Sequence, residues 1–273
     1  MDRRGGNYVK SEELAWQNKW GGAFQSDAYD RPGTRVVLER QFARIGEALQ
    51  LTPAVCVLDL GCGIGKLLAW LNAHLPSRCH GLDLSFQSTL SARREDPTLR
   101  LVVGDSEFLP YKDATFGRVV CNGAAHHFIE LRPVLAEIYR VLAPGGRLVL
   151  YEPASTGFTN AVRTLVFWSK KFESPADLAH KEEFRGDLVR SALVEAGFTH
   201  CSLTWHDFLA YPLSGNYLRS PLSRSRAVMS YLSQLEDKLE HCSPFSHLRE
   251  WFSWRVLVVA TKPVDRPAAP RDA

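Results

Sequence analysis

Long hydrophobic runs are missing from this sequence. No apolar stretch in the 273 residues approaches the roughly 18 to 20 residues that are needed to span a bilayer. The charged amino-terminal segment MDRRGGNYVKSEELAW is not followed by the apolar core of a secretion signal. We therefore expect no transmembrane segment and a cytoplasmic protein.

The sequence also has no strong excess of one charge and no paired cysteine motif. The net charge is +3, with opposite charges spread along the chain, so nucleic acid is not indicated as a partner. The cysteines show no CxxC pairing and no metal-ligand spacing with histidine, and several lie in apolar runs. We expect no metal site and reduced thiols at Cys56, Cys62, Cys79, Cys121, Cys201 and Cys242.

Apolar runs typical of buried strands alternate with helical segments in the first half of the chain. The helical segment 132–142 has Pro133 at a plausible first position, and APGG at 143–146 ends it. Such alternation predicts an α/β fold with a mostly parallel, doubly wound sheet. The strands are expected at 55–60, 79–84, 100–103, 116–121 and 147–151, with a further helix at 66–75.

Two additions surround this core. The first fifty residues contain helical segments at 11–20 and 34–49, and their aromatic side chains either pack on the core or form a lid; these are Trp16, Trp20, Phe24 and Tyr29. After helical segments at 160–171 and 182–197, strands are expected at 200–208 and 251–261, too far apart for a plain hairpin. The interval contains a helical segment at 226–242 with an apolar stripe of Val228, Tyr231, Leu232, Leu235, Leu239 and Cys242.

These patterns divide the chain into three parts. We expect a helical extension over 1–50, a main domain over 51–262 with an insertion at about 209–250, and a disordered tail over 263–273. Within the insertion, arginines interleave with tyrosines at 211–226, which suits either an anionic ligand or a solvated basic loop. The residues are Tyr211, Tyr217, Arg219, Arg224 and Arg226.

The stretch VLDLGCGIG at 57–65 is the first of several features that meet at one sheet edge. Asp59 ends a strand, and Gly61, Gly63 and Gly65 form a turn before a helix that begins near Lys66. Glycines allow positive φ and close approach of a ligand, and a helix amino terminus offers unpaired N–H groups. A nicotinamide or flavin dinucleotide is the rival ligand, but its GxGxxG fingerprint would need glycine where Lys66 stands.

Two further acids close the next two strands. Asp83 ends the second strand at a distance that suits a carboxylate holding ribose hydroxyls, and Asp105 follows the third. The carboxyl ends of neighbouring strands open into the crevice where open α/β sheets bind ligands. Together, these features predict an adenosine-like ligand.

Four segments in this order and spacing resemble the motifs of class I S-adenosylmethionine-dependent methyltransferases, in particular the group similar to ubiquinone/menaquinone C-methyltransferases. The segments are VLDLGCGIG, GLDLS, VVGDSEFLPYKDATFGRVVCNGAAHHF and VLAPGGRLVLYEP. The resemblance implies a seven-stranded sheet whose last strand is antiparallel, with S-adenosyl-L-methionine as cofactor. One departure is Gly117, since this family usually has Asp after the Phe that begins the fourth strand.

The resemblance also implies roles for individual residues. Asp59 with Gly61, Cys62 and Gly63 would face the methionine portion of the cofactor. The nucleoside would lie against Asp83 and Leu84, which serve the ribose and the adenine, and against Asp105 and Ser106, which serve the adenine amino edge. Asn122, after the fourth strand, would line the site near the methyl group.

Three residues are candidates for helping the reaction. His126 and His127 follow the fourth strand, and an imidazole that titrates near neutral pH could act as a general base, although either histidine could only shape the pocket. Glu152 ends the fifth strand, where it could orient an acceptor amine or hydrogen-bond the backbone. His180 and His206 are expected to be structural or exposed.

The leading hypothesis is methyl transfer to a small-molecule acceptor, chiefly by alignment and exclusion of water, with acceptor specificity in the extension and the insertion. An RNA- or protein-directed methyltransferase is the alternative, as is a protein that keeps the cofactor without methylating. The sequence leaves oxygen, nitrogen and carbon acceptors open.

Overall fold

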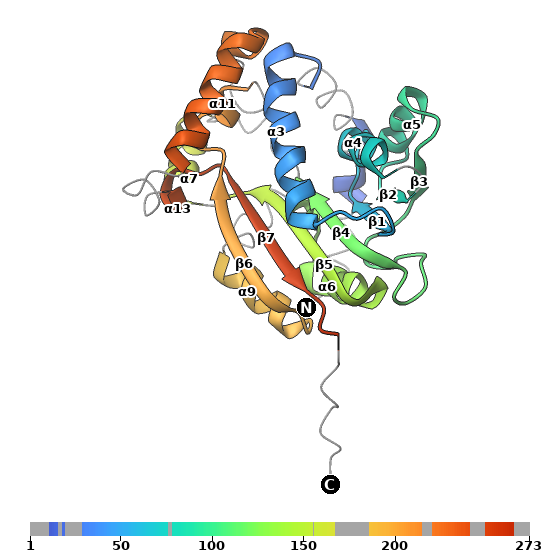
Figure 1. The fold of residues 1–273 in the computed structure, drawn as a ribbon. Helices are drawn as coiled ribbons and strands as arrows, with labels where there is room; N and C mark the ends of the chain where they lie inside the picture. Colours follow the sequence, from blue (N-terminus) through green and yellow to red (C-terminus); the bar gives the residue numbers. More distant parts are fainter. Residues whose placement is uncertain are drawn as a thin grey trace.

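A seven-stranded sheet forms the centre of the chain in the computed structural model (Figure 1). The structure describes residues 11–15, 18–19, 29–75, 78–154, 156–166, 186–214, 220–240 and 249–264. The strands lie in the order β3-β2-β1-β4-β5-β7-β6, and β7 is antiparallel to both of its neighbours. Their bounds are β1 Val57–Leu60, β2 Cys79–Asp83, β3 Arg100–Val103, β4 Phe116–Asn122, β5 Leu142–Pro153, β6 Thr199–His206 and β7 Arg255–Thr261. The predicted fold class is confirmed.

Helices cover both faces of the sheet, as the doubly wound prediction requires. One face packs on α6 (Leu131–Val141) and α9 (Gly186–Glu195), through a core that includes Leu135, Ile138 and Leu193. The other face packs on α3 (Pro32–Leu49) and α4 (Lys66–His74). The remaining elements are α5 Phe86–Glu95, η2 Ala125–His127, α7 Gly157–Val166, α10 Ala210–Leu213, η4 Pro221–Arg224, α11 Arg226–Glu240 and α13 Arg249–Phe252.

The apolar β1 is fully buried because it has a helix layer on each side and a parallel strand at each edge. Val57 pairs with Cys79 of β2 and with Arg118 of β4, so the carboxyl ends of β2, β1 and β4 lie next to one another. Residues that follow these three strands therefore meet at one edge. Among the described helices, none is long and apolar enough to cross a membrane.

Several sequence-based details need correction. Pro133 is the third residue of α6 rather than the first, a position that still tolerates proline because N–H groups in the first turn have no intrahelical partner. The strand expected from residue 251 begins at Arg255, since 251–252 belong to α13, where Trp251 and Phe252 are exposed. Helix α7 spans 157–166, and residues 167–185 lie outside the described part of the chain.

Other predictions fall partly outside the described residues. Five cysteines are free, of which Cys62, Cys79 and Cys121 are buried, whereas Cys242 is not described. The same holds for Trp16, Trp20, Phe24, His180, the arginine loop at 215–219 and residues 265–273. Tyr29 packs against the core beneath α3, and Arg224 and Arg226 are exposed.

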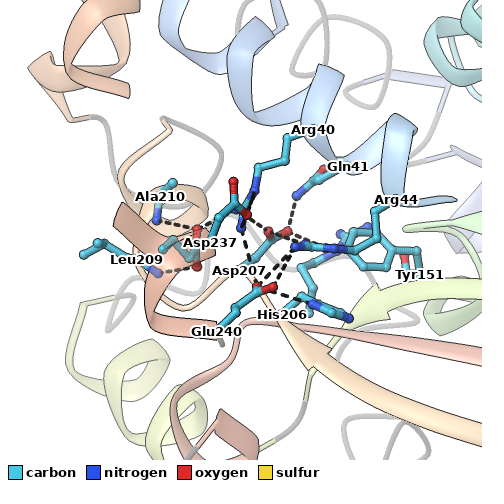
Figure 2. A network of polar contacts seen from close by, with 12 residues as sticks. Arg40, Gln41, Arg44, Tyr151, His206, Asp207, Leu209, Ala210, Asp237 and Glu240 are labelled. Carbon is cyan, nitrogen blue, oxygen red and sulfur yellow. Dashed lines mark hydrogen bonds and ion pairs between the residues drawn. The ribbon is translucent and has the colours of Figure 1, made fainter. Parts of the chain in front are cut away.

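Helix α11 of the insertion turns only part of its apolar stripe inward, where Leu232 packs against a buried apolar cluster. Val228 and Tyr231 are exposed, whereas the buried positions are Met229, Ser233, Glu236 and Glu240. The burial of two glutamates has a clear cause: α11 lies along α3, which presents Arg40 and Arg44 (Figures 1 and 2). Electrostatic pairing therefore contributes to the choice of the inward face of α11. Hydrophobic burial contributes too, because Met229 lies in one apolar cluster with Val37 of α3.

The ion cluster joins α3, α11 and the end of β6 (Figure 2). Arg40 Nη1 donates to Glu236 at 2.7 Å, and Arg44 Nη2 donates to Glu240 Oε2 at 3.0 Å. Both arginines also contact Asp207, which accepts a hydrogen bond from the Tyr151 hydroxyl at 2.7 Å. Since Tyr151 lies in β5, the cluster attaches the insertion to the central sheet.

The buried acids of this cluster outnumber its arginines. Asp207, Glu236 and Glu240 face Arg40 and Arg44, and His206 contacts Glu240 with a pKa lowered mainly by burial. Burial and the nearby Asp207 carboxylate raise the pKa of Glu236 to about 7. A pKa of about 7 means that Glu236 is only partly protonated near neutral pH.

Candidate active site

Three glycines shape the turn between β1 and α4. Gly61, Gly63 and Gly65 all have positive φ, at 74°, 53° and 75°, where a side chain is strained. The N–H of Gly61 donates to the Leu82 carbonyl at 2.7 Å, which ties the turn to β2. A Cβ on Gly61 would lie 2.4 Å from the Cβ of Ala124. Packing against the loop after β4 is thus sufficient reason for glycine at 61, independent of any ligand.

Asp83 spans the gap between this turn and α5. Its two carboxylate oxygens accept hydrogen bonds from the N–H groups of Gly63, at 2.7 Å, and Ser85, at 2.8 Å. Burial raises the pKa of Asp83 despite these two bonds and the nearby His127. Each oxygen keeps a further lone pair that can accept a hydroxyl.

Asp59 lies at the bottom of the site and is 1% exposed. Its Oδ2 has no hydrogen-bond partner among the described residues. Burial, followed by the charge of Asp83, raises the pKa of Asp59 to about 8. Leaving a buried carboxyl oxygen unsatisfied costs free energy, so this atom marks a place where a donor from a ligand fits.

The other predicted cofactor residues are spread along the same edge. Cys62 is buried in the glycine turn, and Leu84 is partly buried directly after Asp83. Asp105 and the partly buried Ser106 follow β3, where the Asp105 carboxylate accepts the N–H of Glu107 at 3.0 Å. They lie one strand farther from β1 than Asp83, in the direction away from Asn122.

His126, which follows β4, and Glu152, near the end of β5, form a fixed pair. The His126 Nδ1 lies 2.7 Å from Glu152 Oε2, and Glu152 Oε1 accepts the N–H groups of Ala124 and Ala125 at 3.0 Å each. Burial alone would raise the pKa of Glu152, but the hydrogen bond and charge of His126 hold it below its usual value. The geometry favours a role for Glu152 in holding the backbone and His126.

His127 lies beside this pair with a carboxylate of its own. The two imidazole rings are 4.0 Å apart, and the Nδ1 of His127 lies 3.2 Å from the Glu13 carboxylate. Glu13 belongs to the amino-terminal segment and is 4% exposed. Sequence reasoning missed Glu13, because an acidic residue in SEELAW carries no local signal for a partner more than a hundred positions away.

Sequence reasoning also missed Arg255. This buried arginine donates to the Asn122 side chain at 2.7 Å and to the Tyr151 carbonyl at 2.6 Å. Its guanidinium carbon lies 4.6 Å above the Tyr151 ring, and Tyr211 accepts a hydrogen bond at 3.3 Å. Arg255 therefore fixes the side chain of Asn122. The available signal for this residue in the sequence was a single arginine within the apolar run WFSWRVLVV.

The chain shares its sequence pattern with known methyltransferases. Residues 58–150 match the family described as "Methyltransferase domain". Over 201 residues, the chain is 31% identical to the methyltransferase YcgJ of Bacillus subtilis (strain 168), an alignment that covers 67% of this chain and 72% of YcgJ. The chain belongs to the class I S-adenosylmethionine-dependent methyltransferases.

Two further comparisons extend this result. The demethylmenaquinone methyltransferase of Deinococcus radiodurans is 37% identical over 132 residues, which cover 46% of this chain and 54% of that protein. The crystal structure of YcgJ superimposes with a TM-score of 0.54 at 18% identity, over 84% of this methyltransferase and 100% of that chain, which shows a shared fold. The chain spans about a third to a half of the length of the curated relatives it matches first.

S-adenosylmethionine, the cofactor of this family, fits the residues at this edge. Its ammonium group is the kind of donor that the buried Asp59 Oδ2 lacks. Its carboxylate suits the amino terminus of α4, which begins after Gly65 without a side-chain cap. Asp83 has acceptor capacity for the ribose. The assignments of the individual residues remain predictions.

Proposed function

We propose that this methyltransferase transfers the methyl group of S-adenosylmethionine to a small organic acceptor in the cytoplasm. The observation that carries the proposal is the unsatisfied carboxyl oxygen of Asp59 beneath the glycine turn. It lies on the edge where Asp83, Asn122 and the two histidines also lie. A buried acceptor for an ammonium group in this position suits an amino-acid-bearing nucleoside better than a dinucleotide.

The side chains have separable roles in this proposal. When bound, the cofactor supplies a methyl group already activated on a sulfonium, so the protein mainly aligns the acceptor and excludes water. Asp59 holds the ammonium, Asp83 the ribose, and Asp105 with Ser106 the adenine edge. Asn122, held by Arg255, borders the reacting groups.

His127 is the proposed general base. The acceptor loses its proton as it gains the methyl group, and the Nε2 of His127 takes that proton when Nδ1–H is directed at Glu13. His126 is held by Glu152, which also fixes the loop that carries both histidines. Glu152 is thus proposed to act through His126 and the backbone rather than on the acceptor.

Several observations support a small-molecule acceptor. The matched relative from Deinococcus radiodurans is named for demethylmenaquinone, a small organic acceptor. A structural neighbour from Streptomyces coelicolor A3(2), with a TM-score of 0.55 at 16% identity over 84% of this chain and 80% of that one, is a geranyl diphosphate C-methyltransferase. We further propose that the extension over 1–50 and the insertion at about 209–250 determine which acceptor enters.

Calorimetric titration tests the cofactor part of this proposal. S-adenosylmethionine and S-adenosylhomocysteine are both expected to bind the full chain with one site. Asp59→Asn is expected to weaken both ligands at least tenfold, because a charge-assisted hydrogen bond is worth about 1.5 to 3 kcal/mol. The absence of binding by either ligand would refute the proposal.

A second experiment tests the acceptor class. Comparison of metabolites in cells with and without the protein is expected to reveal a product that is one methyl group heavier. An RNA-directed enzyme would instead show RNA binding that weakens steeply with salt. Methylation of RNA or protein, with no methylated metabolite, would overturn the small-molecule assignment.

A further inference from the structure

Two described residues of the amino-terminal segment contact loops at the carboxyl edge of the sheet. Glu13 contacts His127 in η2, directly after β4, and Asn18 accepts a hydrogen bond from the Ser85 hydroxyl at 2.7 Å, directly after β2. Strand β1 lies between β2 and β4 in the sheet. Glu13 and Asn18 therefore contact the loops on either side of the loop that follows β1.

Both contacts involve loops that already carry predicted site residues. Ser85 caps α5 and is two residues from Asp83, while His127 interacts electrostatically with Asp83. Glu13 is nearly as buried as the core, although it is charged and near the start of the chain. A carboxylate is buried in this way only when interactions with a partner offset the free-energy cost of removing it from water.

We propose that Glu13 is a positioning residue: its carboxylate lies at Nδ1 of His127 and fixes the imidazole for proton transfer. The proposal rests on the proposed function, in which His127 is the base. Glu13 touches neither reacting group in this scheme and acts only through His127.

The chemistry follows from the two ring nitrogens. A carboxylate at Nδ1 holds the proton there, so the lone pair lies on Nε2, which can accept the proton of the acceptor. The resulting imidazolium is stabilised by Glu13 and, more weakly, by Asp83. The positive charge on His127 is disfavoured by His126, whose ring lies 4.0 Å away and is itself paired with Glu152.

Nuclear magnetic resonance of ¹⁵N-labelled histidine tests the proposal without an acceptor. The full chain is titrated with and without S-adenosylhomocysteine, and His127→Gln assigns the signal. In the wild type, we expect the Nδ1–H tautomer at His127. In Glu13→Gln, an amide oxygen keeps the hydrogen bond but the charge is gone, so we expect the same tautomer and a His127 pKa lower by about one unit.

Two more variants separate positioning from general structural effects. Glu13→Leu removes both the charge and the acceptor, so the Nε2–H tautomer should become populated in addition to the fall in pKa. Asn18→Ala loosens the other contact of the segment and should leave the tautomer and the pKa of His127 as in the wild type. A wild-type titration of His127 in both Glu13 variants would overturn the proposal.

The same experiment separates this proposal from the proposed function. If S-adenosylhomocysteine fails to bind, the proposed function is refuted, while titration of the ligand-free chain still reports whether Glu13 controls His127. If the ligand binds and the Glu13 variants leave His127 unchanged, only the positioning role is lost.

Discussion

At the scale of single residues, Gly61 shows how backbone conformation and packing combine. Its φ of 74° and a Cβ position 2.4 Å from Ala124 predict that Gly61→Ala destabilises the protein by about 3 kcal/mol. Denaturant unfolding measures the loss. Ala124→Gly in the same chain should recover part of it, because it removes the overlap but not the strain.

Gly157 provides the matched control for this change. A Cβ there would meet nothing within 4 Å, and the residue opens α7. Gly157→Ala is therefore expected to change stability by less than about 1 kcal/mol. Equal losses at the two glycines would show that the turn after β1 is not sterically constrained.

Asp59 couples ligand binding to protonation. With a pKa of about 8, the buried carboxyl is mostly protonated at pH 7, whereas the ammonium of a ligand requires the carboxylate. Binding of S-adenosylhomocysteine at pH 7 should release most of one proton, and affinity should rise with pH up to about 8, at most tenfold per unit. Calorimetry in buffers of different ionisation enthalpy measures the protons released.

Two variants control for other titrating groups. Asp59→Asn should abolish the proton release on ligand binding, since asparagine has no carboxyl proton to lose. Asp83→Asn should move the rise in affinity to lower pH, because the charge of Asp83 contributes to the raised pKa of Asp59. Identical binding heats for the wild type in all buffers would contradict this role of Asp59.

At the scale of elements, Glu236 of α11 should make stability depend on pH. Its folded pKa of about 7 lies above the model-peptide value of 4.5. The folded state therefore keeps a proton between these values that the unfolded state loses. The stabilisation is complete below about pH 4.5 and is lost as pH rises to about 7.

The variant Glu236→Gln lacks this titration. Relative to the variant, the wild type should lose about 2 to 3 kcal/mol of unfolding free energy between pH 5 and pH 7.5. Asp237→Asn, next in sequence but half exposed, should follow the wild-type curve closely. Parallel pH curves for wild type and Glu236→Gln would exclude Glu236 as the titrating group.

The same helix shows where sequence reasoning is weak for an element. The pattern at 226–242 correctly predicted a helix, because periodicity and propensity are local properties. The apolar stripe identified the buried face only in part, because that face also depends on Arg40 and Arg44, almost two hundred residues earlier in the chain. An ion pair between residues far apart in the sequence cannot be recognised from the local pattern around either residue.

At the scale of the whole molecule, the sheet was predictable because its strands follow from local patterns. The packing of α11 was only partly predictable, because it also depends on residues far apart in the sequence. The central strand β1 of the sheet is buried throughout, and Asp83 and Asn122 lie at strand ends as their positions after apolar runs predicted. Glu13, Arg255 and Asp207 could not be paired from sequence, since their partners come from other elements. The residues at the strand ends follow from local patterns, whereas pairs such as Glu13 with His127 join residues far apart in the sequence.

The ion cluster should make the insertion and α3 one cooperative unit with the sheet. Arg44 links α3 to Glu240 of α11, to Asp207 after β6 and to Tyr151 of β5 (Figure 2). Arg44→Met removes one of the two arginines that contact the buried Asp207 and Glu240 carboxylates, a change that costs about 3 kcal/mol. Hydrogen exchange should then show protection in α11 falling about 100-fold more than in β4.

Arg132→Met is the matched control, because the ion pair of Arg132 with Glu195 lies at the surface and contributes little. It should change protection in α11 by less than about threefold. An equal fall in α11 and β4 in Arg44→Met would mean that the insertion opens only when the whole molecule unfolds. A selective fall in α11 would show that ion pairs help to hold the described insertion to the sheet, in addition to the apolar contacts of Met229 and Leu232.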